Sequence, residues 1–299
     1  MKVNHIYNKP VTCLEPGEIV TERYNGSNAK FAIFKTTQIA DDTTICFSEL
    51  KKFEWIDWGD GNVTLDPLEE KVSHKYESAN GEKEFVIVVM GVDNFGEGKQ
   101  INDDPYDIFE GDYIKEAYFG EGTKIWANEN SAKGFSNAHN LTTVQNLAQC
   151  PIAFFLPDLR SNDFKLIEKL SFNIDCHTIK EWGLSSTRYK FQTLEIPDHI
   201  TTIETKAFYG IDFGEDKDPY GGDFVHIILP KNIKVLGELC FESSKIKVFY
   251  KGTSDDWGKI DTHENIGTEA IFYYSETEPT EVGNYWHYVD GKPTAWEVT

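Results

Sequence analysis

The stretch LEIPDHITTIETKAF, residues 194–208, decides the fold because its pattern returns at residues 227–241 as IILPKNIKVLGELCF. The matched apolar and proline positions lie 33 residues apart, as Pro197 does from Pro230. Seven such positions recur in one register. Self-similarity at a fixed period of about 20 to 50 residues indicates a repeat protein.

Each copy predicts a short strand followed by a turn. Leu194 and Ile196 flank a polar residue, so one face of the strand points inward, and the proline that follows cannot donate to the next rung of a ladder. Later apolar residues, from Ile200 to Phe208, return the chain to the same side. One unit cannot bury its apolar face alone, so the units must stack as coils of a solenoid.

These residues resemble the BspA-like leucine-rich repeat, whose units share a strand, an Ile-Pro pair, an Ile-x-x-Ile spacing and an Ala-Phe end. The likeness is specific in residues 194–208 and 227–241 and weaker elsewhere. Repeats of this family are shorter, about 23 residues, so the resemblance implies an insertion near Ile211–Gly222. The glycines, proline and acids of that segment indicate an excursion from one face.

The composition predicts a folded, strand-rich protein that does not bind nucleic acid. Its 299 residues suffice for a substantial core and suggest two domains. The 50 acidic against 29 basic side chains give a net charge of −21. Such a charge repels phosphate backbones and anionic membranes.

The N-terminal sequence and the cysteines indicate in which cellular compartment the protein is expected. A basic start with an apolar core and a small-residue cleavage site is missing, as is any 18-residue apolar stretch, so we expect neither secretion by that route nor membrane insertion. The cysteines are odd in number and form no Cys-x-x-Cys arrangement: Cys13, Cys46, Cys150, Cys176 and Cys240. Because Cys240 takes the repeat position of Ala207, buried reduced thiols are favoured over disulfides or zinc.

Residues 1–92 carry a different pattern, with β-branched and aromatic segments separated by turn residues. One part of this section contains Trp-Gly-Asp-Gly at 58–61, then His74 and Tyr76, and then an alternating strand at 84–90. This part resembles the PKD-like domain. That resemblance implies an Ig-like β-sandwich over residues 1–92.

The motif at 58–61 predicts a tight turn. Gly59 and Gly61 permit positive φ, and Asp60 can accept backbone hydrogen bonds. An alternative makes Asp57 and Asp60 cation ligands, but an EF-hand needs more widely spaced acids and a closing Glu. We therefore favour the structural turn.

Residues 93–275 are predicted to form the solenoid. The sequence Phe-Gly-Glu-Gly occurs at 95–98 and again at 119–122, an offset of 24 that is close to one coil. Between 150 and 190 the repeat is degenerate, although apolar residues continue. The fold class we expect is therefore mainly β, with a PKD/Ig-like sandwich followed by a BspA-like solenoid.

Residues 276–299 are predicted to close the solenoid. Asp290-Gly291 lies between aromatic-rich runs, which is a strong hairpin signal, and a solenoid needs its open end sealed. Just before it, Trp257 is expected to cover the last coil. The C-terminal stretch also resembles tails attached to BspA-like repeats in bacterial and phage-encoded proteins.

Catalytic motifs are missing from the sequence. It has no Gly-x-Ser-x-Gly elbow, P-loop or dinucleotide fingerprint, and His263-Glu264 lacks the second histidine of a zincin. His74 has no accompanying nucleophile, so we interpret it as a turn or core-edge residue rather than a base. We expect a protein that is not an enzyme and holds no cofactor or metal.

Two features remain as candidate sites. The acidic segment 212–223 is either simply solvated or gathers calcium through oxygen ligands. The aromatic residues Tyr285, Trp286 and Tyr288 either pack the cap against the last coil or stack on a partner protein or sugar. These three are the candidate partner-binding residues.

Three functional hypotheses follow. The first is a phage virion component that is made in the host cytoplasm and serves as a decoration, fibre or tail-associated protein. Its partners would be other virion proteins or a host surface protein or glycan, and it could act as an oligomer in an assembly. The second is a bacterial cell-surface adhesin or glycan-binding module. The third, a carbohydrate-active enzyme, needs a carboxylate pair that the sequence does not locate.

Overall fold

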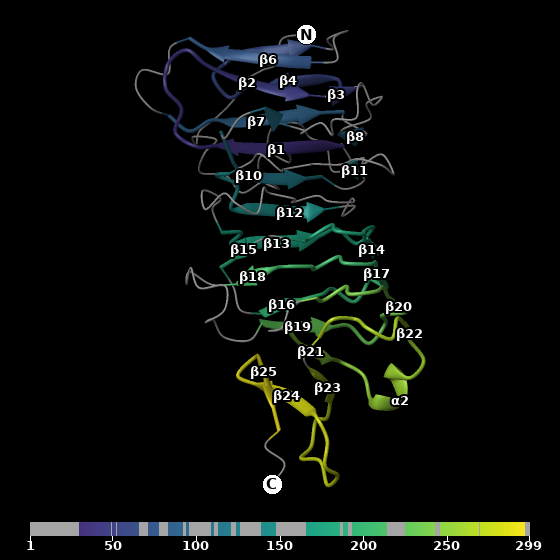
Figure 1. The fold of residues 1–299 in the computed structure, drawn as a ribbon. Coiled ribbons are helices and arrows are strands. Elements are labelled where there is room, and N and C mark those ends of the chain that lie inside the picture. The colour runs from purple at the N-terminus through teal and green to yellow at the C-terminus, as the bar shows by residue number, and fades with distance from the viewer. Residues whose placement is uncertain are drawn as a thin grey trace. The chain divides into compact units, whose positions relative to one another are not determined.

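The computed structural model is mainly β, with almost no helix and a β-solenoid of about four turns (Figure 1). It describes residues 30–48, 50–51, 53–65, 71–77, 83–91, 94–95, 109–110, 113–120, 124–125, 139–147, 166–185, 188–190, 193–213, 225–242, 246–268 and 270–296. The described residues up to 147, with 169–173, form one compact unit. Residues 166–168 and those from 174 onward form a second.

The first unit is built on a seven-stranded sheet. Its strands are, in sheet order, β13 (Lys169–Phe172), β12 (Thr143–Leu147), β10 (Ile114–Phe119), β1 (Phe31–Thr36), β7 (Val86–Met90), β4 (Trp55–Asp57) and β5 (Val63–Leu65). The pairs from β10 to β5 are antiparallel, whereas β10, β12 and β13 are parallel. Every residue of β7 is buried, which explains its continuous run of apolar side chains.

Two three-stranded sheets complete this unit. One contains β6 (Lys71–Tyr76), β2 (Thr43–Ser48) and β9 (Phe109–Glu110), and the other β11 (Lys124–Ile125), β8 (Asn94–Phe95) and β3 (Leu50–Lys51). The Phe34 ring of β1 lies 5.4 Å from that of Phe47 in β2, and Phe47 lies 5.6 Å from Trp58. All three are fully buried, so an aromatic core joins the seven-stranded sheet to the sheet that contains β2.

The second unit is a stack of parallel strands. One sheet holds β14 (Thr178–Ile179), β17 (Thr202–Ile203), β20 (Val235–Leu236) and β22 (Asp261–Thr262). A second holds β16 (Thr193–Glu195), β19 (Val225–Leu229), β21 (Ile246–Tyr250), β23 (Ala270–Tyr274), β24 (Tyr285–Val289) and β25 (Lys292–Ala295), and β15 (Arg188–Tyr189) pairs with β18 (Asp212–Phe213). The solenoid expected from the repeats is confirmed.

The 33-residue repeat is also the register of the stack. Leu194 is the Cα partner of Ile227, and Ile203 is that of Leu236. The rings of Phe208 and Phe241 stack at 5.7 Å. Each residue of the repeat therefore lies next to its own counterpart in the neighbouring coil.

Cys240 is buried in this stack, at the place that Ala207 takes in the previous coil. Its thiol is free, as are those of Cys46 and Cys176, and burial raises its pKa. The expectation that this thiol is buried is confirmed at Cys240. Residues Cys13 and Cys150 lie outside the described residues.

A left-handed turn residue recurs in three coils and was not expected from the sequence. Trp182, Lys206 and Leu239 have φ of 58°, 56° and 51°. Like the strands, they are spaced by one coil, because each lies four residues after the first residue of β14, β17 or β20. Next to them the Phe208 N–H donates to Cys240 O at 2.8 Å and the Phe241 N–H to Ile266 O at 2.9 Å. The turns thus form a hydrogen-bonded ladder of their own.

The C-terminal hairpin is present as expected. β24 and β25 pair antiparallel around Asp290 and Gly291, whose φ values of 50° and 75° are typical of a type I′ turn. Before it lies α2 (Ser254–Trp257), whose N-cap residue Thr253 forms a capping box with Asp256. The Trp257 ring meets Tyr250 and Tyr273 edge-on, so it covers part of the last coils.

Within the residues predicted to form the solenoid, β10 and β12 pair in parallel but share a sheet with β1. One detail differs from the sequence-based expectation. The offset of 24 between residues 95–98 and 119–122 is not a stacking register. Phe95 pairs instead with Ile125, whereas Phe119 pairs with Ala32.

Candidate functional site

The turn at 58–61 is the local structure that shapes the candidate site of the first unit. Gly59 and Gly61 have φ of 82° and 99°, and the Gly59 N–H donates to the Asp57 carboxylate at 2.9 Å. Asp60 accepts a hydrogen bond from the Asn62 backbone N–H at 3.0 Å. The expected tight turn is confirmed. The described part of the chain contains no group of three or more His, Cys, Asp or Glu residues placed to hold a metal ion.

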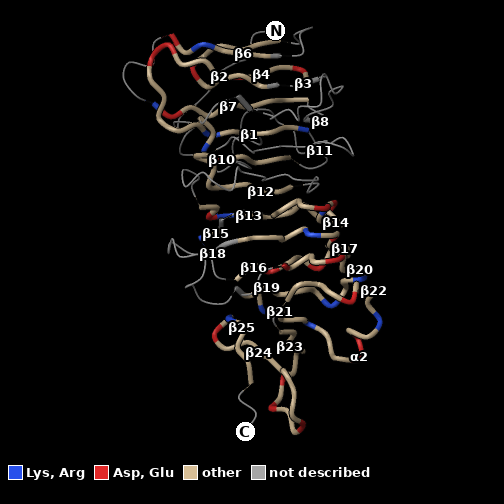
Figure 2. Tube along the Cα trace, in the orientation of Figure 1, with Lys and Arg blue, Asp and Glu red and all other residues tan. Residues whose placement is uncertain are grey.

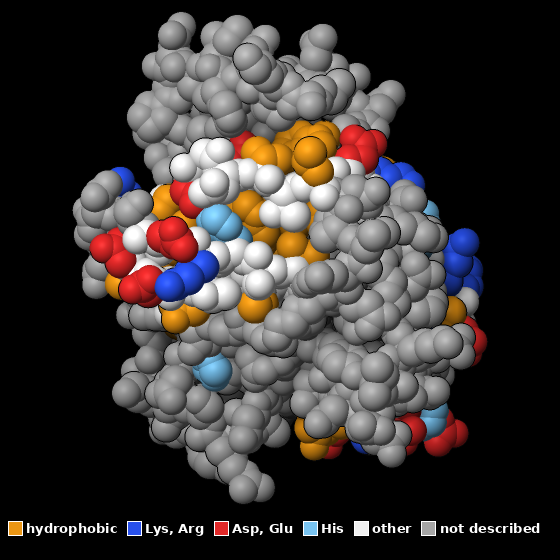
Figure 3. All heavy atoms as spheres, turned by 90° about the horizontal axis from the view of Figure 1, so that it is seen from above, with side chains coloured by type: hydrophobic (Ala, Val, Ile, Leu, Met, Phe, Trp, Pro, Cys, Tyr) orange, Lys and Arg blue, Asp and Glu red, His pale blue; other side chains and the backbone are white. Residues whose placement is uncertain are grey.

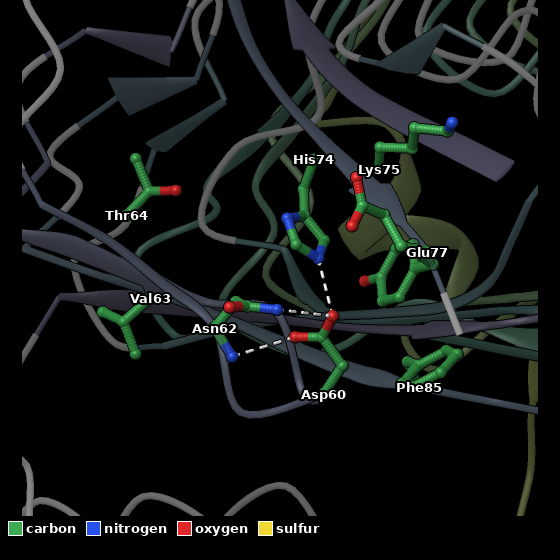
Figure 4. A pocket seen from close by; sticks show the side chains of 9 residues that line it. Asp60, Asn62, Val63, Thr64, His74, Lys75, Glu77 and Phe85 are labelled. Atoms are coloured by element: carbon green, nitrogen blue, oxygen red, sulfur yellow. Dashed lines mark hydrogen bonds and ion pairs between the residues drawn. The ribbon is translucent and has the colours of Figure 1, made fainter. Parts of the chain in front are cut away.

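Asp60 also fixes His74, which comes from β6 on the other sheet. The His74 Nε2 lies 2.7 Å from Asp60 Oδ2 (Figure 4). The imidazole stacks on Trp58 with ring centroids 4.9 Å apart and meets the Tyr76 ring edge-on at 4.7 Å. The Tyr76 hydroxyl in turn donates to Trp58 O at 2.9 Å. His74 is therefore a core-edge residue, as its sequence context indicated, and its ring is held in one orientation.

Electrostatics favour an ionised Asp60 beside this histidine. Partial burial acts to raise the pKa of Asp60, but hydrogen bonds from Asn62 and His74 outweigh it and lower the pKa. Burial, together with the charges of Asp60 and Asp57, raises the pKa of Tyr76, so that its hydroxyl stays protonated.

A hollow of about 520 Å³ lies over the Asp60–His74 pair. Its walls come from the turn, β5, β6 with the residue after it, and the residue before β7: Asp60, Asn62, Val63, Thr64, His74, Lys75, Tyr76, Glu77 and Phe85. Seen from above, the described part of the surface mixes charged, polar and hydrophobic side chains (Figure 3). The sequence predicted the turn but not the hollow, because the residues that line it come from strands of two different sheets.

The aromatic residues predicted to bind a partner separate into two groups in the second unit. Trp286 is fully buried, its Nε1–H donates to Tyr250 O at 2.8 Å, and its ring meets Phe249 at 5.4 Å. Of the two alternatives for Trp286, its burial supports packing of the cap, because a ring with no exposed surface does not stack on a partner. Tyr285 is partly buried, and Tyr288 is 39% exposed. For these two, partner binding stays a prediction.

The cap covers the outward face of the sheet, where Ile228, Phe249 and Trp286 form a small core. His226 lies beside it, with its ring 4.8 Å from Phe249 and edge-on. Burial lowers the pKa of His226, and the neighbouring Lys247 charge lowers it further. His226 is therefore the titratable member of this apolar face.

Charged residues of both signs lie along the turns of this unit (Figure 2). Lys180 and Glu204 pair between adjacent coils at 2.8 Å, and Lys251 pairs with Glu195 at 2.6 Å beside Tyr288. Such exposed pairs contribute about 0–1 kcal/mol each. They fit a solvated surface. Of the acidic segment 212–223, residues 214–223 lie outside the described residues, so the calcium alternative stays open.

Comparisons with protein-family models, curated proteins and solved structures match nothing to this chain. Among the described residues, no helix combines the length and the apolar character needed to cross a membrane.

The turn can be tested with two alanine substitutions. A Cβ at Gly61 would meet no atom within 4 Å. Gly61→Ala should therefore lower the free energy of unfolding only by the strain of a left-handed backbone, about 1–2 kcal/mol. A Cβ at Gly59 would lie 2.6 Å from Val86 O. Gly59→Ala should therefore lower the free energy of unfolding by about 1–3 kcal/mol more than Gly61→Ala does. Urea unfolding of the two variants measures the difference, and equal losses would contradict the turn geometry.

The cap can be tested by acidification. The pKa of His226 is lower in the folded than in the unfolded protein, so the unfolded protein binds the proton first as the pH falls below about 6.5. The stability that neutral His226 provides is complete above that pH and is lost on acidification through the folded pKa. The melting temperature should therefore drop between pH 7.5 and 5.5, and less so in His226→Gln.

Exposed His263 supplies the matched control for this experiment. The pH profile of His263→Gln should follow that of the unmodified protein. Identical profiles for His226→Gln and the unmodified protein would show that His226 does not sit against the cap as described.

Proposed function

We propose that this chain is a non-enzymatic binding and assembly protein, and specifically a component of a phage particle. The observation that supports it best is the solenoid of the second unit, whose coils repeat in register and end in a hairpin. Solenoids offer extended rigid surfaces for partners. Fold alone does not determine function, so the sequence resemblances carry the rest of the proposal.

The finer identity of the modules is part of this proposal. The strand-and-turn order of residues 194–208 and 227–241 fits a BspA-like leucine-rich repeat. Antiparallel pairing of β1, β7, β4 and β5, with a glycine turn at 58–61, fits a PKD-like sandwich in the first unit. The resemblance of the C-terminal stretch to tails of phage-encoded repeat proteins favours the particle over other settings.

The cap is the surface we propose for protein or host contacts. Tyr288 exposes part of its ring while Trp286 supports it from below at 4.9 Å. The charged groups of Lys251 and Glu195 lie nearby and can set the orientation of a partner. A rigid aromatic group that is half-exposed and backed by a buried one is typical of an interface anchor.

The setting is tested by locating the native protein. Purified phage particles and host cell fractions from the source are probed with an antibody to the recombinant chain. Signal on intact particles, confirmed by mass spectrometry, supports the virion proposal. Signal on the host envelope alone overturns it in favour of a bacterial cell-surface adhesin, the alternative that the two resemblances would also suit.

A further inference from the structure

We propose that the hollow over Asp60 and His74 binds a saccharide residue through its hydroxyl groups. This site lies in the first unit and does not depend on the cap. If the chain is a particle protein that meets a host surface, the inference also names one class of ligand there, and to that extent it rests on the proposed function.

The hollow presents oriented hydrogen-bonding groups. The side-chain amide of Asn62 donates an N–H to Asp60 Oδ2 at 3.0 Å. Its side-chain oxygen can still accept a hydrogen bond. The Thr64 hydroxyl accepts the Trp58 Nε1–H at 2.8 Å and can still donate its own proton. These two side chains offer an acceptor and a donor without further rearrangement.

His74 supplies a further hydrogen-bonding group. Its Nε2 is engaged by Asp60, and in Figure 4 the other ring nitrogen points away from that carboxylate, toward the side where Thr64 lies. Because Trp58 and Tyr76 hold the ring from two directions, binding a ligand costs little side-chain entropy. Glu77 adds an exposed carboxylate at the rim.

Charge and polarity of the walls narrow the class of ligand. Lys75, the one cation of the lining, is paired with Asp42 at 2.6 Å, while Asp60 and Glu77 are acidic, so an anionic ligand is disfavoured. An apolar ligand would leave the oriented polar groups unpaired, which is costly. Sugar hydroxyls both donate and accept, and the apolar side chains of Val63 and Phe85 can contact the C–H face of a sugar ring.

Saturation-transfer NMR on the full chain tests this site. The probes are glucose, galactose, mannose, rhamnose and N-acetylglucosamine, each at about 10 mM, a concentration that fills most of a site whose Kd is about 1 mM. We expect transfer to at least one of them. His74→Phe keeps a ring against Trp58 but removes both nitrogens, and Glu77→Gln removes the rim charge; each should raise Kd at least about tenfold.

Glu54→Gln is the matched control, an exposed carboxylate of the same unit that does not line the hollow. Its Kd should be unchanged. If thermal melting shows that His74→Phe has lost its fold, Glu77→Gln alone decides. Absence of transfer to all five sugars, or unchanged affinity in the folded variants, overturns the proposal. Neither result alters the antibody signal on particles, so the two proposals fail separately.

Discussion

The second unit depends on hydrogen bonds between coils, and above all on the ladder that joins the turns. A parallel strand of two residues, such as β17, gains little by itself. The Lys206 N–H donates to Glu238 O at 2.9 Å and the Phe208 N–H to Cys240 O at 2.8 Å, which extends the same register past the strand. Since buried backbone groups must be paired, a coil that slipped by one residue would lose this ladder and its apolar columns together.

The end of the stack has to be closed for the same reason. Without a following strand, the backbone edge of β23 would be unpaired and the apolar ring of Phe272 would be open to water. β24 pairs with β23 in parallel, and β25 then turns back antiparallel, so that the last edge strand carries Lys292 and Pro293. Both residues discourage further strand addition. Trp286 of this hairpin is fully buried against Phe249, so the cap contributes to the core.

The sequence predicted those features whose signals are local or periodic. The repeat, the Gly59 turn, the buried Cys240 and the Asp290-Gly291 hairpin all follow from spacing or from backbone demands on particular residue types. The left-handed residues did not, because Trp182 and Leu239 carry no glycine-like signature. The hollow was missed as well, since Asp60 and His74 meet only when two sheets pack. For Trp286 the sequence left packing of the cap and contact with a partner as alternatives, because composition alone does not separate exposed from buried aromatic residues.

Residue-resolved amide hydrogen exchange tests the central claim, the shared ladder, most directly. The amides of Phe208 and Phe241 should be protected to the same degree as those of β19 and β21, because all of them open only when the coils separate. Fast exchange at these turn amides, with protection retained in the strands, would contradict the account. It would show that strand pairing alone holds the coils in register.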